Sequence, residues 1–198
     1  MLTNFRARVE SGIDSTARRG HRRPGSAPDN ELMPSAHTLA ETEEQVVSKL
    51  GALPLDFEAM AVVSNLFRAA NATRNYLERS VLAESGLSWT AFVVLWVTWI
   101  WEPIETRQIA EEGGFSKATL TGVLGTLEAK GYLVRERSDK DGRLVNVSMT
   151  PAGRTLMTTL FPTFNSHEQT ISSTIDPDRR RELAEMLRAV TLVTEGQR

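Results

Sequence analysis

The sequence contains no cysteine among its 198 residues, which excludes disulfide bonds, thiolate metal sites and oxidant sensing through a thiol. It has three histidines, and none lies at metal-ligand spacing from another histidine, so no metal and no cofactor is expected. No serine lies in a Gly-x-Ser-x-Gly setting, and the Walker spacing of a phosphate-binding loop is absent. These absences make an enzyme the weaker interpretation.

The sequence also lacks a long apolar run and a large excess of one charge. The longest apolar stretch, residues 91–101, is too short to span a bilayer, and no leader is visible, so we expect a cytoplasmic protein. The formal net charge is −2, so support for nucleic-acid binding must come from local charge. A hydrophobic content of 40% allows one medium-sized domain with a substantial core.

Residues 104–130 predict two helices joined by a tight turn. The first helix is centred on Ile109, and the glycines of residues 113–115 form the turn. The second begins at Ser116, whose hydroxyl can accept a free backbone N–H of the first turn. Its opposite face is small and free of carboxylates, as in a helix that enters a DNA major groove. The residues expected on its buried face are Leu120, Val123, Leu124 and Leu127.

A charged hairpin follows. Short β-prone runs at residues 132–134 and 144–147 bracket a segment rich in Arg, Lys and Asp, with the strong turn signal Asp141-Gly142. The hairpin would project Lys140 and Arg143, which from a narrow wing can reach phosphates or a minor groove. The predicted unit is a winged helix-turn-helix.

The run of residues 86–153 resembles transcriptional regulators of the MarR family. Asp141 and Arg143 match the family's wing pattern D-x-R-D-x-R, whereas Ser138 and Lys140 depart from it. The other matching pieces are Leu95-Trp96, Ile109-Ala110-Glu111, Ser116-Lys117-Ala118-Thr119 and Leu127-Glu128-Ala129-Lys130-Gly131.

The resemblance implies a mainly α fold with a small β wing (α+β), flanked by N- and C-terminal dimerisation helices. Residues 41–86 would form the N-terminal helices, 87–150 the winged helix-turn-helix and 151–198 the C-terminal helices. Residues 1–40, rich in Arg, Gly, Ser and Pro, predict a disordered basic tail. Pro162 is expected to kink or break the helix that contains it.

Two alternatives to a simple tail stay open. The arginine cluster at residues 18–23 could be a basic arm that adds nonspecific DNA affinity, or translation could start downstream at Met33.

The implied function is sequence-specific regulation of transcription by a homodimer, most often a repressor in this family, on a pseudo-palindromic operator in double-stranded DNA. A small aromatic or phenolic ligand would release it. The alternative from another class is a winged-helix module that binds protein rather than DNA, which the near-neutral charge and the glycine-rich face of the second helix leave open.

The resemblance assigns DNA contacts to the second helix and to the wing. Gly122 and Thr126 stand where relatives commonly have Arg, and Gly125 replaces a common Asp. Each interior glycine costs the helix about 1 kcal/mol relative to alanine, so close approach to DNA is a reason for its presence. The expected contacts in the helix are Ser116, Lys117, Ala118, Thr119, Thr121, Gly122 and Thr126; those in the wing are Arg137, Lys140, Asp141 and Arg143.

All four tryptophans lie within residues 89–101. Their helical spacing favours core packing, and the sharper hypothesis is an aromatic wall of a ligand pocket with a few polar anchors. The candidate pocket residues are Arg68, Asn71, Arg74, Trp96, Trp99 and Trp101.

Overall fold

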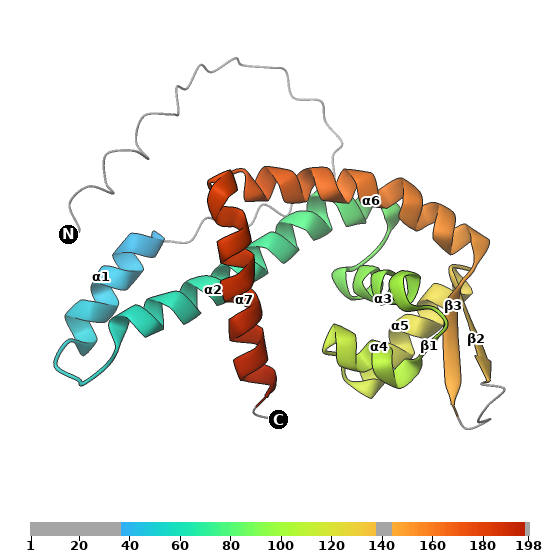
Figure 1. Cartoon of the computed structure of the whole chain (residues 1–198), viewed down its shortest axis with the longest axis horizontal. Helices are drawn as coiled ribbons and strands as arrows, with labels where there is room; N and C mark the ends of the chain where they lie inside the picture. Colours follow the sequence, from blue (N-terminus) through green and yellow to red (C-terminus); the bar gives the residue numbers. More distant parts are fainter. Residues whose placement is uncertain (1–36, 138–143, 197–198) are drawn as a thin grey trace, which may run out of the picture. The chain divides into compact units, whose positions relative to one another are not determined.

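The computed structural model describes residues 37–137 and 144–196 and divides the chain into two compact units, 1–55 and 56–198 (Figure 1). In the first unit, α1 (Leu39–Leu50) begins with a capping box. The Thr38 hydroxyl accepts from the Glu41 amide, and the Glu41 carboxylate accepts from the Thr38 amide. None of the residues of α1 is buried.

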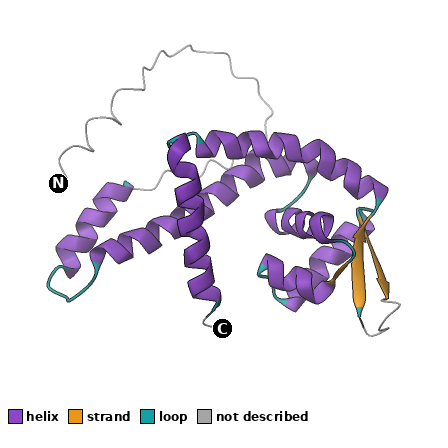
Figure 2. Ribbon diagram, viewed as in Figure 1, coloured by secondary structure: helices purple, strands orange, loops and turns teal. Residues whose placement is uncertain are grey.

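The second unit is mostly helical, with a small sheet, so the predicted mainly α fold with a β wing is confirmed (Figure 2). The sheet is antiparallel with strand order β1-β3-β2. The elements in chain order are α2 (Phe57–Leu77), a π-helical turn (Glu78–Leu82), a 3-10 turn (Ala83–Ser85), α3 (Trp89–Trp101), β1 (Ile104–Glu105), α4 (Thr106–Gly113), α5 (Lys117–Ala129), β2 (Leu133–Arg137), β3 (Val145–Met149), α6 (Pro151–Ser172) and α7 (Pro177–Glu195).

Side-chain caps fix the starts of several helices in this unit. Asp56 accepts from the Ala59 amide at the start of α2, at 2.9 Å. Ser88 caps α3, and Thr150 caps α6 ahead of its first-turn proline. Each cap satisfies an amide that has no partner within its helix, which is why these boundaries can be predicted locally.

Two features differ from the sequence-based expectation. The two-residue strand β1 pairs Ile104 with Val147, and it is too short for an alternating pattern to reveal. The helix α6 continues through Pro162, so the expectation of a break is wrong. The lost hydrogen bond is offset by the rings of Phe161 and Phe164, which pack on α3 from either side of the proline.

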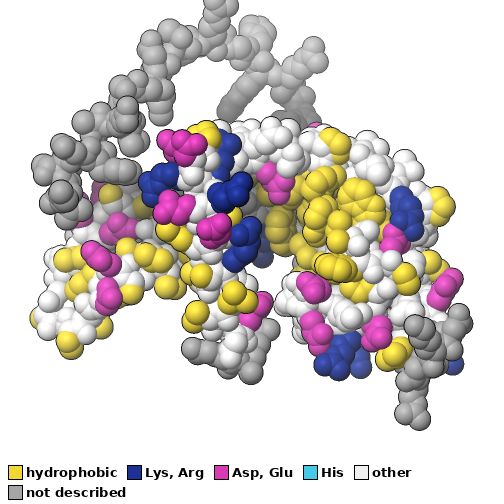
Figure 3. Space-filling view, viewed as in Figure 1, with side chains coloured by type: hydrophobic (Ala, Val, Ile, Leu, Met, Phe, Trp, Pro, Cys, Tyr) yellow, Lys and Arg dark blue, Asp and Glu magenta, His cyan; other side chains and the backbone are white. Residues whose placement is uncertain are grey.

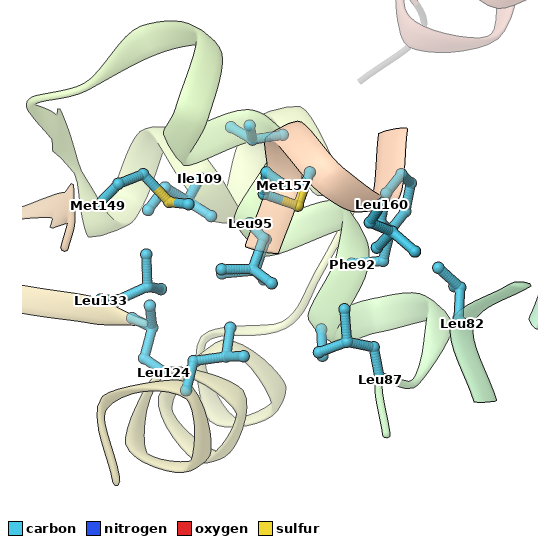
Figure 4. Close-up of a cluster of buried hydrophobic side chains, with 14 of the residues drawn as sticks. Leu82, Leu87, Phe92, Leu95, Ile109, Leu124, Leu133, Met149, Met157 and Leu160 are labelled. Carbon is cyan, nitrogen blue, oxygen red and sulfur yellow. The ribbon is translucent and has the colours of Figure 1, made fainter. Parts of the chain in front are cut away.

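The hydrophobic core of the second unit is built around α3. Leu95 lies in one buried cluster with Ile109 of α4, Leu124 of α5 and Met157 of α6, and all four are almost fully buried (Figure 4). Burying a side chain of this size stabilises the fold by about 1.5–3 kcal/mol. The helix-turn-helix and α6 therefore pack against one shared helix.

Glu102 fastens the end of α3 to the wing and to α6. Its carboxylate accepts from the Met149 amide of β3 at 2.6 Å and pairs with Arg154 of α6. The Glu102 side chain is only 12% exposed. Removal of the Glu102 carboxylate would leave the part-buried Met149 amide without an acceptor.

We expect Glu102→Ala to lower the free energy of unfolding by about 2 kcal/mol, because the Met149 amide and Arg154 both lose their acceptor. Glu102→Gln should lose less, since its amide oxygen can still accept from Met149. Urea denaturation of both variants measures the difference. Equal stability of Glu102→Ala and wild type would contradict the fastening role.

Among the described residues no single helix has the length and hydropathy to cross a membrane. The segments Phe57–Ser85 and Trp89–Trp101 meet these criteria only as a pair, and they are bent by 77°.

Candidate nucleic-acid interface

The turn between α4 and α5 positions the start of α5 at the surface. Gly114 has φ +65°, a left-handed conformation that glycine adopts without steric cost, and it ends α4. The Phe115 amide then donates to the Ala110 carbonyl at 2.9 Å, Ser116 follows as the N-cap, and α5 begins at Lys117. Ser116 accepts from the Thr119 amide at 3.1 Å. The predicted helix-turn-helix is therefore present.

The two faces of α5 differ as the periodicity predicts. Leu120, Leu124 and Leu127 are buried, and Val123, which was predicted on the same face, is half-buried. All of the residues predicted to contact DNA from this helix are exposed: Ser116, Lys117, Ala118, Thr119, Thr121, Gly122 and Thr126. Thr121 and Thr126 donate their hydroxyl hydrogens to backbone carbonyls of the helix, so their lone pairs and methyl groups remain for contacts with a ligand surface.

Nothing inside the described part of the chain requires the glycines of α5. A Cβ built at Gly122 or Gly125 would meet no described atom within 4 Å, apart from the helix's own backbone. Alanine would fit both positions and would favour the helix. A partner packed closely against α5, outside the described part of the chain, would be one reason for glycine at these positions.

The wing stands beside this face. Its strands β2 and β3 are longer than the sequence predicts, and Arg137 is exposed at the outer end of β2, where it pairs with Val145. Lys140, Asp141 and Arg143 lie outside the described residues.

Arg135 connects the wing to α5. Its Nε donates to the Glu128 carboxylate at 2.9 Å, linking β2 to the last turn of α5. Hydrogen bonds from Arg135 hold the pKa of the Glu128 carboxyl below its usual range. Because Arg135 is already paired, Lys117 and Arg137 are the freer cations of this surface in the described part of the chain.

A hollow of about 770 Å³ lies between α4, the start of α5 and the sheet. Its lining includes Arg107, Lys117 and Arg135, with Glu111 as the opposing charge. Arg107 is paired with Glu111 at 2.8 Å. The hollow gives the surface a concave, mildly basic shape next to the N-terminus of α5.

A second concavity lies away from this surface, between α2, α3 and α6. We call it the aromatic groove, and its volume is about 390 Å³. Figure 3 shows hydrophobic side chains gathered over α3 and α6 on this face. The groove is lined by Thr73, Leu77, Trp89, Phe92, Val93, Trp96, Phe161, Phe164, Glu168 and Ile171.

Among the described residues that line this groove, Trp96 is the only one that was predicted as a pocket residue. Trp99 packs behind it with its ring centre 6.0 Å from that of Trp96, and Trp101 is 63% exposed. The structure does not bring the three polar candidates of α2 to the groove, where α2 contributes Thr73 and Leu77 instead. Those three candidates are Arg68, Asn71 and Arg74.

The groove contains residues that sequence reasoning missed. Phe161 and Phe164 of α6 stack on Trp96 and Phe92, with ring centres 4.6 and 4.3 Å apart. The sequence shows that both residues are apolar, but nothing local indicates which helix they meet. Glu168 lies one turn beyond Phe164 on the same face of α6, and no sequence motif singles it out.

The comparisons with known proteins agree with this geometry. The MarR family model matches residues 87–145. The Bacillus subtilis protein YwaE, an uncharacterized HTH-type transcriptional regulator, is 37% identical over 155 residues, which cover 77% of this chain and 91% of YwaE. The Staphylococcus aureus transcriptional regulator SarZ is 31% identical over 102 residues, covering 48% of this chain and 69% of SarZ. These relatives are transcriptional regulators rather than enzymes.

Solved structures share the fold. Sco3205 of Streptomyces coelicolor, a MarR family regulator in complex with DNA, has a TM-score of 0.64 and 18% identity, over 70% of this chain and 88% of Sco3205. BpsR of Bordetella bronchiseptica, whose DNA binding is regulated by 6-hydroxynicotinic acid, has a TM-score of 0.60 and 25% identity, over 66% of this chain and 98% of BpsR.

Proposed function

The chain belongs to the MarR family of transcriptional regulators, and from that premise we propose that it is a homodimeric repressor released from operator DNA by a small aromatic ligand. The observation that supports DNA recognition most directly is the exposed face of α5. That face bears no carboxylate among its described residues and includes two glycines that no contact within the described part of the chain requires.

In this proposal α5 enters a major groove. Ser116, Lys117 and Thr119 hold the helix N-terminus on a phosphate, where the helix dipole favours negative charge. Ala118 and Thr121 approach base edges, and a thymine methyl suits both. Gly122 and Thr126 lie further along the same face.

The wing adds contacts to the backbone or to the flanking minor groove. Arg137 supplies a long cation at the end of β2, and Lys140, Asp141 and Arg143 belong to the same proposed set, outside the described residues. With no Arg on the reading face of α5, DNA shape and the wing contribute more of the specificity than direct base contacts.

Exposed apolar side chains on the outer helices support the homodimer. Phe67 of α2 is 71% exposed and Leu192 of α7 is 70% exposed, and α7 has no buried residue. Large apolar surfaces of this kind are covered by partners, and a second copy of the chain can cover both at once. Two-fold symmetry then requires a pseudo-palindromic operator with half-sites about one helical turn (~34 Å) apart.

The aromatic groove is the proposed ligand site. It lies between α3, which packs against both helices of the helix-turn-helix, and the α2 and α6 helices that flank that unit. A ligand that binds one arrangement of these helices more tightly than another shifts the population between them. Ligand binding would thereby change the spacing of the two recognition helices in a dimer.

The test is a gel shift of the full chain on duplex DNA from upstream of its own gene, at two salt concentrations. A discrete complex that survives excess competitor DNA supports the proposal. No complex on that DNA, followed by none on a random-sequence pool, would favour the module that binds protein instead.

Lys117→Ala is expected to weaken operator binding about equally across sequences and to reduce the slope of log affinity against log salt by about 1. The physical reason is the loss of one phosphate contact at the N-terminus of α5. Lys49→Ala, in α1, is the matched control and should leave the slope unchanged. An unchanged slope in Lys117→Ala would remove Lys117 from the DNA contacts.

A further inference from the structure

The described lining of the aromatic groove includes an acidic side chain but no basic one. Glu168 is the one ionisable side chain among the described residues that line it, and the other polar groups are the Thr73 hydroxyl and the indole N–H groups of Trp89 and Trp96. No Lys, Arg or His belongs to that described lining. A ligand bound here therefore meets a carboxylate and no compensating cation.

Glu168 lines the groove from an exposed position on α6. Its carboxylate is exposed and accepts a hydrogen bond from the neutral amide of Asn165 at 2.9 Å. The neighbouring His167 is turned to a different partner, since its Nδ1 lies 2.8 Å from the Tyr76 hydroxyl. That contact joins α6 to α2 and leaves Glu168 to set the sign of the charge in the groove.

The walls of the groove favour the same sign. Among the lining residues Phe92 and Phe164 are buried, whereas Trp89, Trp96 and Phe161 are half-buried. The faces of aromatic rings carry partial negative charge and attract cations, Trp most strongly. Trp96 stacks on Phe161 and Phe92 on Phe164, so these rings cover one face of each other. A ring face left open would act on a bound ion in the same direction as the carboxylate.

We propose that the aromatic groove binds a hydrophobic aromatic cation, an aryl amine or quaternary onium compound, in preference to an anion of the same shape. The inference rests on the proposed ligand-released DNA binding and specifies the class of ligand. A volume of about 390 Å³ suits a compound of drug-like size. An aromatic acid would bring its negative charge next to Glu168, against walls that solvate it poorly.

Tetraphenylphosphonium and tetraphenylborate provide a matched test, because they have nearly the same shape and opposite charge. Both are titrated into the full-length protein by calorimetry, with tryptophan fluorescence as the second readout because Trp89 and Trp96 line the groove. We expect the cation to bind at least about tenfold more tightly.

Glu168→Gln should weaken binding of the phosphonium about fivefold, because it removes the carboxylate charge and keeps the shape of the side chain. The ratio of phosphonium affinity to borate affinity should therefore fall. Glu84→Gln removes an equal charge from an exposed turn outside the groove and should leave both affinities unchanged. Equal affinity for both ions, a preference for the borate, or no response to Glu168→Gln would each overturn the proposal.

Two further outcomes separate this inference from the proposed function. If the cation binds through Glu168 and the operator complex persists, the ligand class stands and ligand-released repression fails. If the operator complex is dissociated by the borate and not by the phosphonium, repression stands and the ligand class fails.

If neither ion binds and a fluorescence quencher reaches Trp89 and Trp96 only after the dimer is diluted apart, the groove belongs to a subunit interface and the proposal is overturned.

Discussion

Gly153→Ala is expected to lower the free energy of unfolding by about 3 kcal/mol. A Cβ built at Gly153 would lie 2.2 Å from the Tyr132 carbonyl oxygen, 3.0 Å from its carbon and 3.1 Å from Cε of Met149. The carbonyl cannot move aside freely, because it accepts a hydrogen bond from the Thr150 amide at 3.0 Å. Accommodating one methyl group therefore requires the first turn of α6 to separate from the start of β2.

Urea denaturation of the variant measures the loss, and Gly122→Ala is the matched control. The control adds the same methyl group to an open helical position, so its stability should rise rather than fall. If Gly153→Ala proves as stable as wild type, the close approach of α6 to Tyr132 is not a constraint on the fold. The same separation would loosen the base of the wing, so Gly153→Ala should also weaken DNA binding.

Local signals account for what the sequence predicted well. Ser116 caps α5, and Gly114 has the left-handed φ that the turn requires. Each of these depends on interactions within four or five residues of chain. The spacing of Leu120, Leu124 and Leu127 likewise determines which face of α5 is buried without knowledge of its partner.

Contacts between distant segments could not be predicted in the same way. Trp96 meets Phe161 across more than sixty residues of sequence, and Glu102 meets Arg154 across more than fifty. Periodicity shows that each helix has an apolar face, but not which face it opposes. Consequently the tryptophans suggested a pocket, while its second wall and its acidic residue, Glu168, emerged only from the fold.

One helix lies between the two proposed sites. Phe92 and Trp96 of α3 line the aromatic groove, whereas Leu95 belongs to the buried cluster that includes α4 and α5. Side chains in a close-packed core move as a unit and do not deform continuously. A ligand that repositions α3 in the groove would therefore carry the helix-turn-helix with it, which gives the proposed release of DNA a physical route.

The double variant Gly122→Ala/Gly125→Ala is expected to fold more stably and to bind DNA less well. Each alanine should raise the free energy of unfolding by up to about 1 kcal/mol, because the helix gains propensity and neither Cβ meets a described neighbour. On DNA the two methyl groups occupy space that the proposed close approach requires. We expect affinity for the operator to fall at least tenfold, or about 1.4 kcal/mol.

Opposite signs in the two measurements make this prediction specific. General loss of structure would lower stability and binding together, whereas a steric clash with DNA lowers binding alone. The substitutions change no charge, so the salt dependence of the remaining binding should equal that of the wild type, unlike that of Lys117→Ala. Unchanged or tighter DNA binding by the stabilised double variant would show that the glycine face of α5 does not approach DNA, and the surface opposite Leu120, Leu124 and Leu127 would then need another partner.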